Sequence, residues 1–172
     1  MRHIISILVE NEFGVLSRVA GLFSGRGFNI ESLSVAETLD PTVSRITLVT
    51  RGDDQVLEQM EKQLNKLICV IKVDDFTETE HVERELVLIK VAADEKTRGE
   101  LANIVDIFRA KIIDVSRQSY VVEITGAEEK VNALIELLRP LGILEIVRTG
   151  KVAMYRGTRL LAVDGTDKEH AA

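Results

Sequence analysis

The sequence has little of what several functional classes require. Among its 172 residues there is one cysteine, Cys69, no tryptophan, five phenylalanines and two tyrosines. A single cysteine forms no intrachain disulfide and no multi-cysteine zinc site. Its neighbours Ile68 and Val70 favour a buried small hydrophobic residue over a reactive thiol. With so few aromatic residues, a stacking platform for nucleic-acid bases is not expected either.

Charge and hydropathy exclude further classes. The 22 basic and 28 acidic residues give a net charge of −6, and no block of Lys or Arg stands out. Phosphate backbones require a basic surface, so we expect no nucleic-acid partner. No apolar run approaches the roughly 20 residues of a membrane helix, and the N-terminus leads into a strand-like pattern without a signal-peptide layout. We expect no membrane partner and a reducing, cytoplasmic location.

Residues for catalysis are also sparse. His3, His81 and His170 are scattered, and none has a Cys, Asp or Glu at metal-ligand spacing. The pair Asp53-Asp54 is explained by helix capping, and Gly25-x-Gly27 lacks the third glycine of a dinucleotide fingerprint. No nucleophile–base arrangement is recognisable. We therefore predict no catalytic residues, no metal site and no enzymatic activity for this chain.

The first half of the chain predicts a strand, a helix, two strands, a helix and a strand. Residues 3–9 are short, rich in Ile and Val and followed by polar residues, which is typical of a buried strand. After Gly14, apolar residues recur at helical spacing until Gly25-Arg26-Gly27. The remaining strands are expected at 29–37, 44–50 and 70–76, and a second helix after Gly52-Asp53-Asp54.

The second half repeats this order. Gly52, Leu64, Leu67 and Val70 correspond to Gly126, Leu138, Leu141 and Leu144 at a constant offset of 74 residues. Strands are expected at 86–91, 111–116, 120–125 and 143–147, with helices around Leu101 to Phe108 and Val131 to Leu138. A repeated β-α-β-β-α-β order predicts an α+β fold of two tandem ferredoxin-like domains. Residues 77–85 are charged, have no apolar periodicity and are expected to link the copies.

The second strand of a ferredoxin-like sheet lies at an edge. Exposed edges are normally protected by Pro, Lys or a bulge. Residues 29–37 contain neither Lys nor Pro and place small serines on one face. We therefore predict that another copy pairs with this strand and forms a homodimer.

One turn has features of a binding site. Asn11-Glu12-Phe13-Gly14-Val15-Leu16 leads from a strand into a helix. A helix begins with unsatisfied N–H groups and partial positive charge, which suit a small carboxylate. Asn11 adds a donor and an acceptor, and Val15, Leu16 and Ile30 are candidates for an aliphatic lining. On these residues alone, an ordinary tight turn is the favoured interpretation.

A family resemblance changes that balance. The stretches VENEFGVLSRVAGLF (residues 9–23) and RGFNIESLSV (residues 26–35) closely resemble the small, regulatory subunit of acetohydroxyacid synthase, also called acetolactate synthase. DPTVSRIT (40–47), EQMEKQLNKL (58–67) and VERELVLIK (82–90) fit the same family. The likeness covers nearly the whole chain and weakens after about Leu161.

The resemblance implies a domain organisation and a role. It implies an effector-binding, dimerising ACT domain at residues 1–78 and a ferredoxin-like domain at 79–163, before a polar tail at 164–172 that we expect to be disordered. The family has no active site of its own. Its partner is the large catalytic subunit, which condenses pyruvate with pyruvate or 2-oxobutyrate. That subunit is expected to use thiamine diphosphate, Mg and FAD, whereas this chain is expected to need no cofactor. The small subunit stimulates the enzyme and confers feedback inhibition by branched-chain amino acids, usually valine.

The resemblance also implies where the effector binds. In the family it lies between two ACT domains, which carries over to Asn11, Gly14, Val15 and Leu16 of one subunit and to Asn29 and Ile30 of the other. Phe13 departs from the family, which commonly has Pro or a small residue there. One alternative is a free-standing tandem-ACT regulator of the glycine-cleavage repressor type, which would lack RGFNIESL. Another is a ferredoxin-like RNA-binding module, which would need aromatic residues on its central strands.

Overall fold

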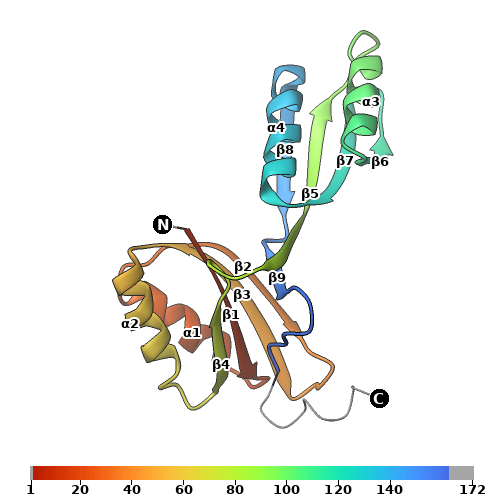
Figure 1. Cartoon of the computed structure of the whole chain (residues 1–172). Coiled ribbons are helices and arrows are strands. Elements are labelled where there is room, and N and C mark those ends of the chain that lie inside the picture. The colour runs from red at the N-terminus through yellow and green to blue at the C-terminus, as the bar shows by residue number, and fades with distance from the viewer. Residues whose placement is uncertain (1, 163–172) are drawn as a thin grey trace. The chain divides into compact units, whose positions relative to one another are not determined.

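The computed structural model describes residues 2–162. It divides into two units, one formed by residues up to Val82 together with the segment from Lys151, and the other by Glu83–Gly150. Each unit has an antiparallel sheet with two helices on one face (Figure 1). The tail expected at 164–172 lies outside the described residues.

The first unit has the predicted ferredoxin-like topology. Its elements are β1 (Arg2–Glu10), α1 (Val15–Ser24), β2 (Ile30–Glu37), β3 (Val43–Arg51), α2 (Asp54–Leu64) and β4 (Val70–Asp75). The strand order is β2-β3-β1-β4, so β2 is at an edge, as predicted. The side chain of Asp53 caps α2 by accepting a hydrogen bond from the Gln55 N–H at 3.1 Å. This confirms the capping role expected for the residues after Gly52.

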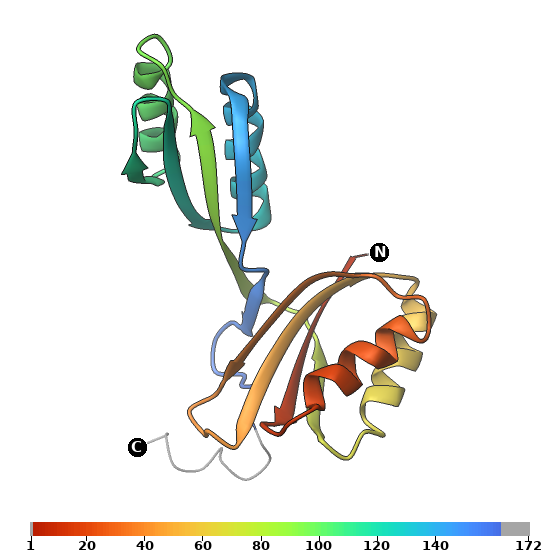
Figure 2. The same cartoon turned by 180° about the vertical axis from the view of Figure 1, so that it is seen from behind.

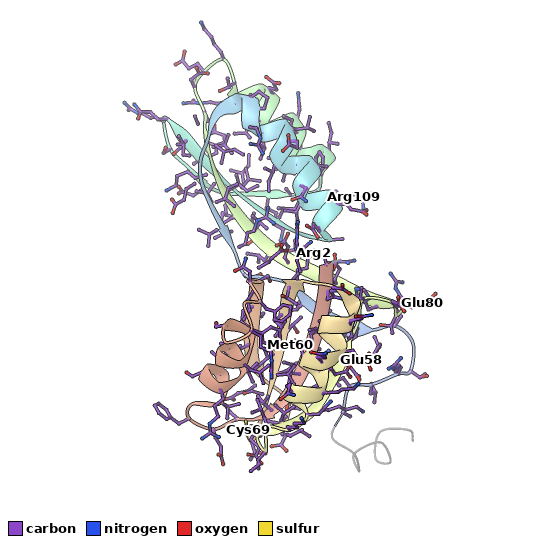
Figure 3. All side chains as sticks on the ribbon, turned by 90° about the vertical axis from the view of Figure 1, so that its left-hand side faces the viewer. Arg2, Glu58, Met60, Cys69, Glu80 and Arg109 are labelled. Carbon is purple, nitrogen blue, oxygen red and sulfur yellow. The ribbon has the colours of Figure 1, made fainter. Side chains whose placement is uncertain are left out.

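The side chains of β1 and β3 point alternately to the two faces of the sheet and form an apolar layer on each face. Ile5, Ile7 and Val9 face the helices with Ile46 and Leu48 of β3. Met60 of α2 is fully buried against them and is labelled in Figure 3. Cys69 is 3% exposed in the same layer, which confirms its assignment as a buried small hydrophobic residue.

The opposite face of this sheet is covered by residues 151–162, here called the strap. It contains β9 (Val152–Tyr155), a strand that the sequence analysis did not predict. Ala153 and Tyr155 pack against Ile4, Val49 and Phe76. The half-buried Arg45 guanidinium donates from Nε to Ser6 Oγ at 2.8 Å and from Nη2 to the Ala153 carbonyl at 2.7 Å. Because both faces of β1 and β3 are covered, nearly every residue of these strands is buried.

The second unit repeats the same topology. Its elements are β5 (His81–Ala92), α3 (Arg98–Ile107), β6 (Lys111–Val115), β7 (Ser119–Gly126), α4 (Glu128–Gly142) and β8 (Ile143–Arg148), with β5 beginning in the first unit. The strand order β6-β7-β5-β8 is equivalent to that of the first sheet, and β9 also pairs with β5 (Figure 2). Leu64 and Leu138, related by the 74-residue offset, are both fully buried near the ends of their helices. The α+β class and the tandem ferredoxin-like fold are therefore confirmed.

Two expected boundaries differ from the structure. Residues 77–85 were expected to be a polar link, but β5 already begins at His81. Pairing with other strands extends β5 into this segment. Glu85 is only 5% exposed, and its Oε1 lies 2.9 Å from Nη1 of the Arg148 guanidinium. The segment from Lys151, expected within a domain at 79–163, belongs to the first unit because its apolar residues cover that sheet. Neither the strand pairing that extends β5 nor the packing of the segment from Lys151 can be recognised from the local periodicity of the sequence.

Candidate functional site

The β1–α1 turn presents an uncapped helix start. Gly14 occupies the N-cap position with φ 83° and ψ −5°. No side chain among the described residues caps α1, and its first turn contains no acidic residue. A Cβ at Gly14 would meet no heavy atom within 4 Å, so the left-handed backbone, and not crowding, is what favours glycine here. The Val15 N–H donates a long hydrogen bond to the Glu12 carbonyl at 3.4 Å, but the positively polarised helix end has no side-chain cap and is a candidate site for an anion.

Asn11 fixes this turn to the β2–β3 connection. Its N–H donates to the Thr42 carbonyl at 2.7 Å. Its side-chain Nδ2 donates to the Glu37 Oε1 at 3.1 Å and to the Pro41 carbonyl at 2.9 Å. The amide nitrogen is thus used within the chain, and Glu37 brings an exposed carboxylate beside it. Sequence reasoning missed Glu37, because it lies 26 residues from Asn11 and nothing in their spacing relates them.

The apolar residues of the turn point in different directions. Val15 is 3% exposed and packs into the core between helices and sheet, so only its backbone faces the turn. Leu16 is 42% exposed and is available to line a site. Phe13 is fully exposed, so in a single chain it does not fill the space beside Gly14.

Asn29 and Ile30 lie at the other end of the sheet. Ile30 opposes Thr50, which in turn opposes His3, whereas the turn follows Glu10. Seven residues of strand separate these positions, about 24 Å at the usual rise. Asn29 is exposed and its carbonyl accepts from Thr50 Oγ1 at 2.9 Å, while Ile30 packs partly on the core. One chain alone does not bring the two predicted halves of the site together.

The described hollows lie elsewhere. One of about 410 Å³ is lined by Arg26, by residues of the C-terminal half of α2 and by Asn65 and Lys66, which follow that helix. Another of about 170 Å³ lies between the start of α3 and the β6–β7 turn. Neither includes a predicted site residue. Among residues 2–162 no three His, Cys, Asp or Glu side chains are grouped so as to hold a metal ion. In the same range no helix is long and apolar enough to cross a membrane.

Comparison with known proteins identifies the family. Residues 5–72 match the family described as the AHAS small subunit-like ACT domain, and residues 84–157 match the small subunit of acetolactate synthase. The chain is 58% identical to the probable acetolactate synthase small subunit of Archaeoglobus fulgidus, over 92% of this chain and 99% of that protein. The chain belongs to the acetolactate synthase small-subunit family.

Further relatives agree with this assignment. The acetolactate synthase small subunit of Haemophilus influenzae is 52% identical, over 92% of this chain and 98% of that protein. The crystal structure of the acetolactate synthase small subunit from Thermotoga maritima matches with a TM-score of 0.82 and 48% identity, covering 91% of this chain and 98% of that one. These relatives are small subunits and not catalytic subunits. The chain is therefore a regulatory type of subunit, and a catalytic subunit is its implied partner.

Proposed function

We propose that this chain stimulates the thiamine-diphosphate-dependent catalytic subunit of acetolactate synthase and confers feedback inhibition by valine. The observation that carries the proposal is the uncapped start of α1, bordered by the Asn11–Glu37 pair, on an ACT domain whose edge strand β2 is open. The helix end offers N–H donors for a carboxylate, and Glu37 offers an acceptor for an ammonium group. The turn thus offers a partner for each of the two charged groups of an amino acid.

The site is completed by a second copy. If the β2 strands of two copies pair antiparallel, Asn29 and Ile30 of one copy approach the β1–α1 turn of the other. Valine then rests its carboxylate on the N–H groups at Gly14 to Leu16, with Leu16 and the second copy's Ile30 as its apolar lining. A ligand held between two copies changes their arrangement by its difference in affinity for the two states. Such coupling is typically about 1–3 kcal/mol, enough to change catalytic output several-fold.

Regulation by this chain does not require chemistry of its own. We expect the purified chain to leave pyruvate unchanged and to stimulate condensation when the catalytic subunit is added. The cofactors expected for the reaction reside on that subunit. The cytoplasmic location expected from the sequence stays a prediction.

The test is reconstitution. The catalytic subunit from the same organism is purified alone, and its activity is measured with increasing amounts of this chain, with and without valine. We expect saturable stimulation and, at saturation, inhibition by valine. Stimulation without valine sensitivity would reject the effector assignment, and condensation by the chain alone would reject the non-catalytic role.

A further inference from the structure

Three large apolar side chains are fully exposed in the first unit. The exposed fractions of Phe13, Leu39 and Ile68 are 104%, 101% and 96%, and the next most exposed large hydrophobic residue among those described is Ile107 at 77%. Each lies in a connection between elements, where Gly, Pro, Asn, Asp and Ser normally predominate. Neither the core nor the turns account for these side chains.

The three connections lie together at one end of the sheet. β3 and β4 both run antiparallel to β1, so the β1–α1, β2–β3 and α2–β4 connections share the end at which β1 finishes. The Glu10 N–H donates to the Cys69 carbonyl at 2.9 Å, and the Asn11 N–H to the Thr42 carbonyl at 2.7 Å. Figure 3 shows Cys69 at the end of this unit away from Arg2. We call the surface formed by Phe13, Leu39 and Ile68 the end patch.

The loops that carry the end patch are held by internal hydrogen bonds. Asp40 Oδ1 accepts from the Thr42 N–H at 2.9 Å and from Thr42 Oγ1 at 2.7 Å. The Thr38 hydroxyl bonds the Asp40 carbonyl at 3.0 Å, and the Leu67 N–H bonds the Leu64 carbonyl at 3.0 Å. A surface that is already ordered loses little conformational freedom on binding.

Charge around the end patch is mostly of one sign. Residues 10–14 and 37–42 contain four carboxylates, those of Glu10, Glu12, Glu37 and Asp40, and no Lys or Arg, while residues 65–69 contain only Lys66. Hydrogen bonds from Thr42 hold the pKa of Asp40 below its ordinary value, so this carboxylate remains ionised. The complementary surface has an apolar centre with Lys or Arg around it.

A second copy paired on β2 approaches the β1–α1 turn that carries Phe13, but it does not cover Ile68. Such a copy extends the sheet outward from β2, whereas Ile68 precedes β4 at the opposite edge. The two edges are three strand spacings apart, about 14 Å. Three large side chains are a suitable centre for an interface of standard size, about 800 Å² per partner.

We infer that the end patch is a docking surface for the catalytic subunit. This inference rests on the proposed function, since it assigns a surface to the partner named there. Phe13, Leu39 and Ile68 enter an apolar depression on the catalytic subunit, and basic groups around it face Glu10, Glu12 and Asp40. Phe13 lies beside the proposed effector site, so docking and effector binding meet at the same turn.

The experiment measures binding of the full chain to the purified catalytic subunit. Leu39→Ser and Ile68→Ser are the main variants, because both lie outside the proposed effector site and neither side chain is packed. Ile107→Ser, at an exposed position of the second unit, is the matched control. We expect each main variant to weaken binding about tenfold and the control to stay within twofold. Glu12→Lys is expected to slow association and to reduce its dependence on salt.

Oligomeric state and valine binding are measured on the same samples. Weaker subunit binding with both properties retained supports the end patch. Unchanged binding by both main variants, while the wild-type chain binds, overturns this inference and leaves the proposed function standing. A shift of the main variants toward monomer assigns the patch to contacts between copies, which also overturns it. Failure of the wild-type chain to bind the catalytic subunit overturns both proposals.

Discussion

The backbone N–H of Lys151 donates to the side-chain Oγ of Ser32 at 2.9 Å. Ser32 lies on β2, two residues after Ile30, and Lys151 is the first residue of the strap. The preceding Gly150 has φ 85°, and the Thr149 N–H is bonded to the Leu86 carbonyl at 3.1 Å within the second unit. The edge strand that carries half of the proposed effector site is therefore fixed directly to the residue at which the chain returns from the second unit.

We predict that Ser32→Ala loosens the strap. The substitution removes the acceptor of a partly buried hydrogen bond, which is worth about 1 kcal/mol. The amide of Lys151 should exchange with solvent several-fold faster, as measured by hydrogen exchange. Ser34→Ala, on the same face of β2 two residues further along, is the control and should leave that rate unchanged. Equal exchange in both variants would mean that the hydrogen bond to Ser32 does not hold the strap.

Removal of the strap should weaken the first unit specifically. A chain that ends at Gly150 uncovers Val49 and Phe76, both fully buried in the complete protein. Burial of a large apolar side chain contributes roughly 1.5–3 kcal/mol, so we expect the first unit to lose at least about 3 kcal/mol. Hydrogen exchange should show loss of protection in β1 and β3 and unchanged protection in β7. Full protection of β1 in the shortened chain would show that the strap is not needed for stability.

The strap illustrates what periodicity does not reveal. β1 was predictable because residues 3–9 are a short run rich in Ile and Val, and β3 because Ile46 and Leu48 lie on one face of a segment of strand length. α1 was predictable because its apolar residues recur at helical spacing. Residues 152–155 are only four in number and mostly apolar, so no alternation marks Ala153 and Tyr155 as the buried pair. The residues against which β9 packs, Ile4, Val49 and Phe76, lie far earlier in the chain. Only tertiary packing determines this contact.

The candidate site was also predictable only in its local features, and not in the contacts that depend on tertiary packing. The glycine before an apolar helix indicated the uncapped turn, and the family resemblance added Asn29 and Ile30. The sequence did not indicate that Asn11 donates to Glu37, because that contact depends on how the β2–β3 connection folds over the turn. The sequence also did not indicate that the side chain of Val15 points into the core, because a valine in the first turn of a helix can face either the core or a binding site.

Tyr155 gives the first unit a pH dependence in the alkaline range. Burial, together with the neighbouring Asp74 carboxylate, raises the pKa of Tyr155 from 10.0 to about 12. The folded state thus favours the protonated phenol. This contribution to stability is complete below pH 10 and is lost as the pH rises toward 12. We expect the unfolding free energy of the wild-type chain to decrease over this range.

Tyr155→Phe provides the comparison. The variant lacks the ionisable hydroxyl but keeps the ring that packs on Phe76 at a centroid distance of 4.4 Å. Urea unfolding at several pH values from 9 upward, followed by circular dichroism, should show a smaller alkaline loss of stability in the variant. The ultraviolet absorbance of the wild-type chain minus that of the variant, which removes the contribution of Tyr120, should show that the Tyr155 tyrosinate forms at pH 11 mainly on unfolding. Identical alkaline profiles for the two chains would exclude Tyr155 as the responsible group.

Gly14→Asp tests the anion site at the start of α1. The new carboxylate competes with the carboxylate of valine for the same N–H groups and repels it. No heavy atom lies within 4 Å of the added Cβ, so the structural cost is limited to a left-handed backbone, which Asp tolerates better than most residues. We expect the Kd for valine, measured by calorimetry, to rise at least about tenfold, which corresponds to roughly 1.4 kcal/mol.

The matched control for Gly14→Asp is Gly157→Asp. Gly157 has φ 68° and, like Gly14, nothing within 4 Å of an added Cβ, but it lies in the strap, outside the predicted site. Both variants introduce one negative charge at a left-handed glycine, so strain and net charge are equal. Only Gly14→Asp should lose valine binding, and both should still stimulate the catalytic subunit. Equal valine affinities would place the effector elsewhere. Loss of stimulation with Gly14→Asp alone would mean that the turn is needed for docking or folding and that valine sensitivity cannot be separated from it.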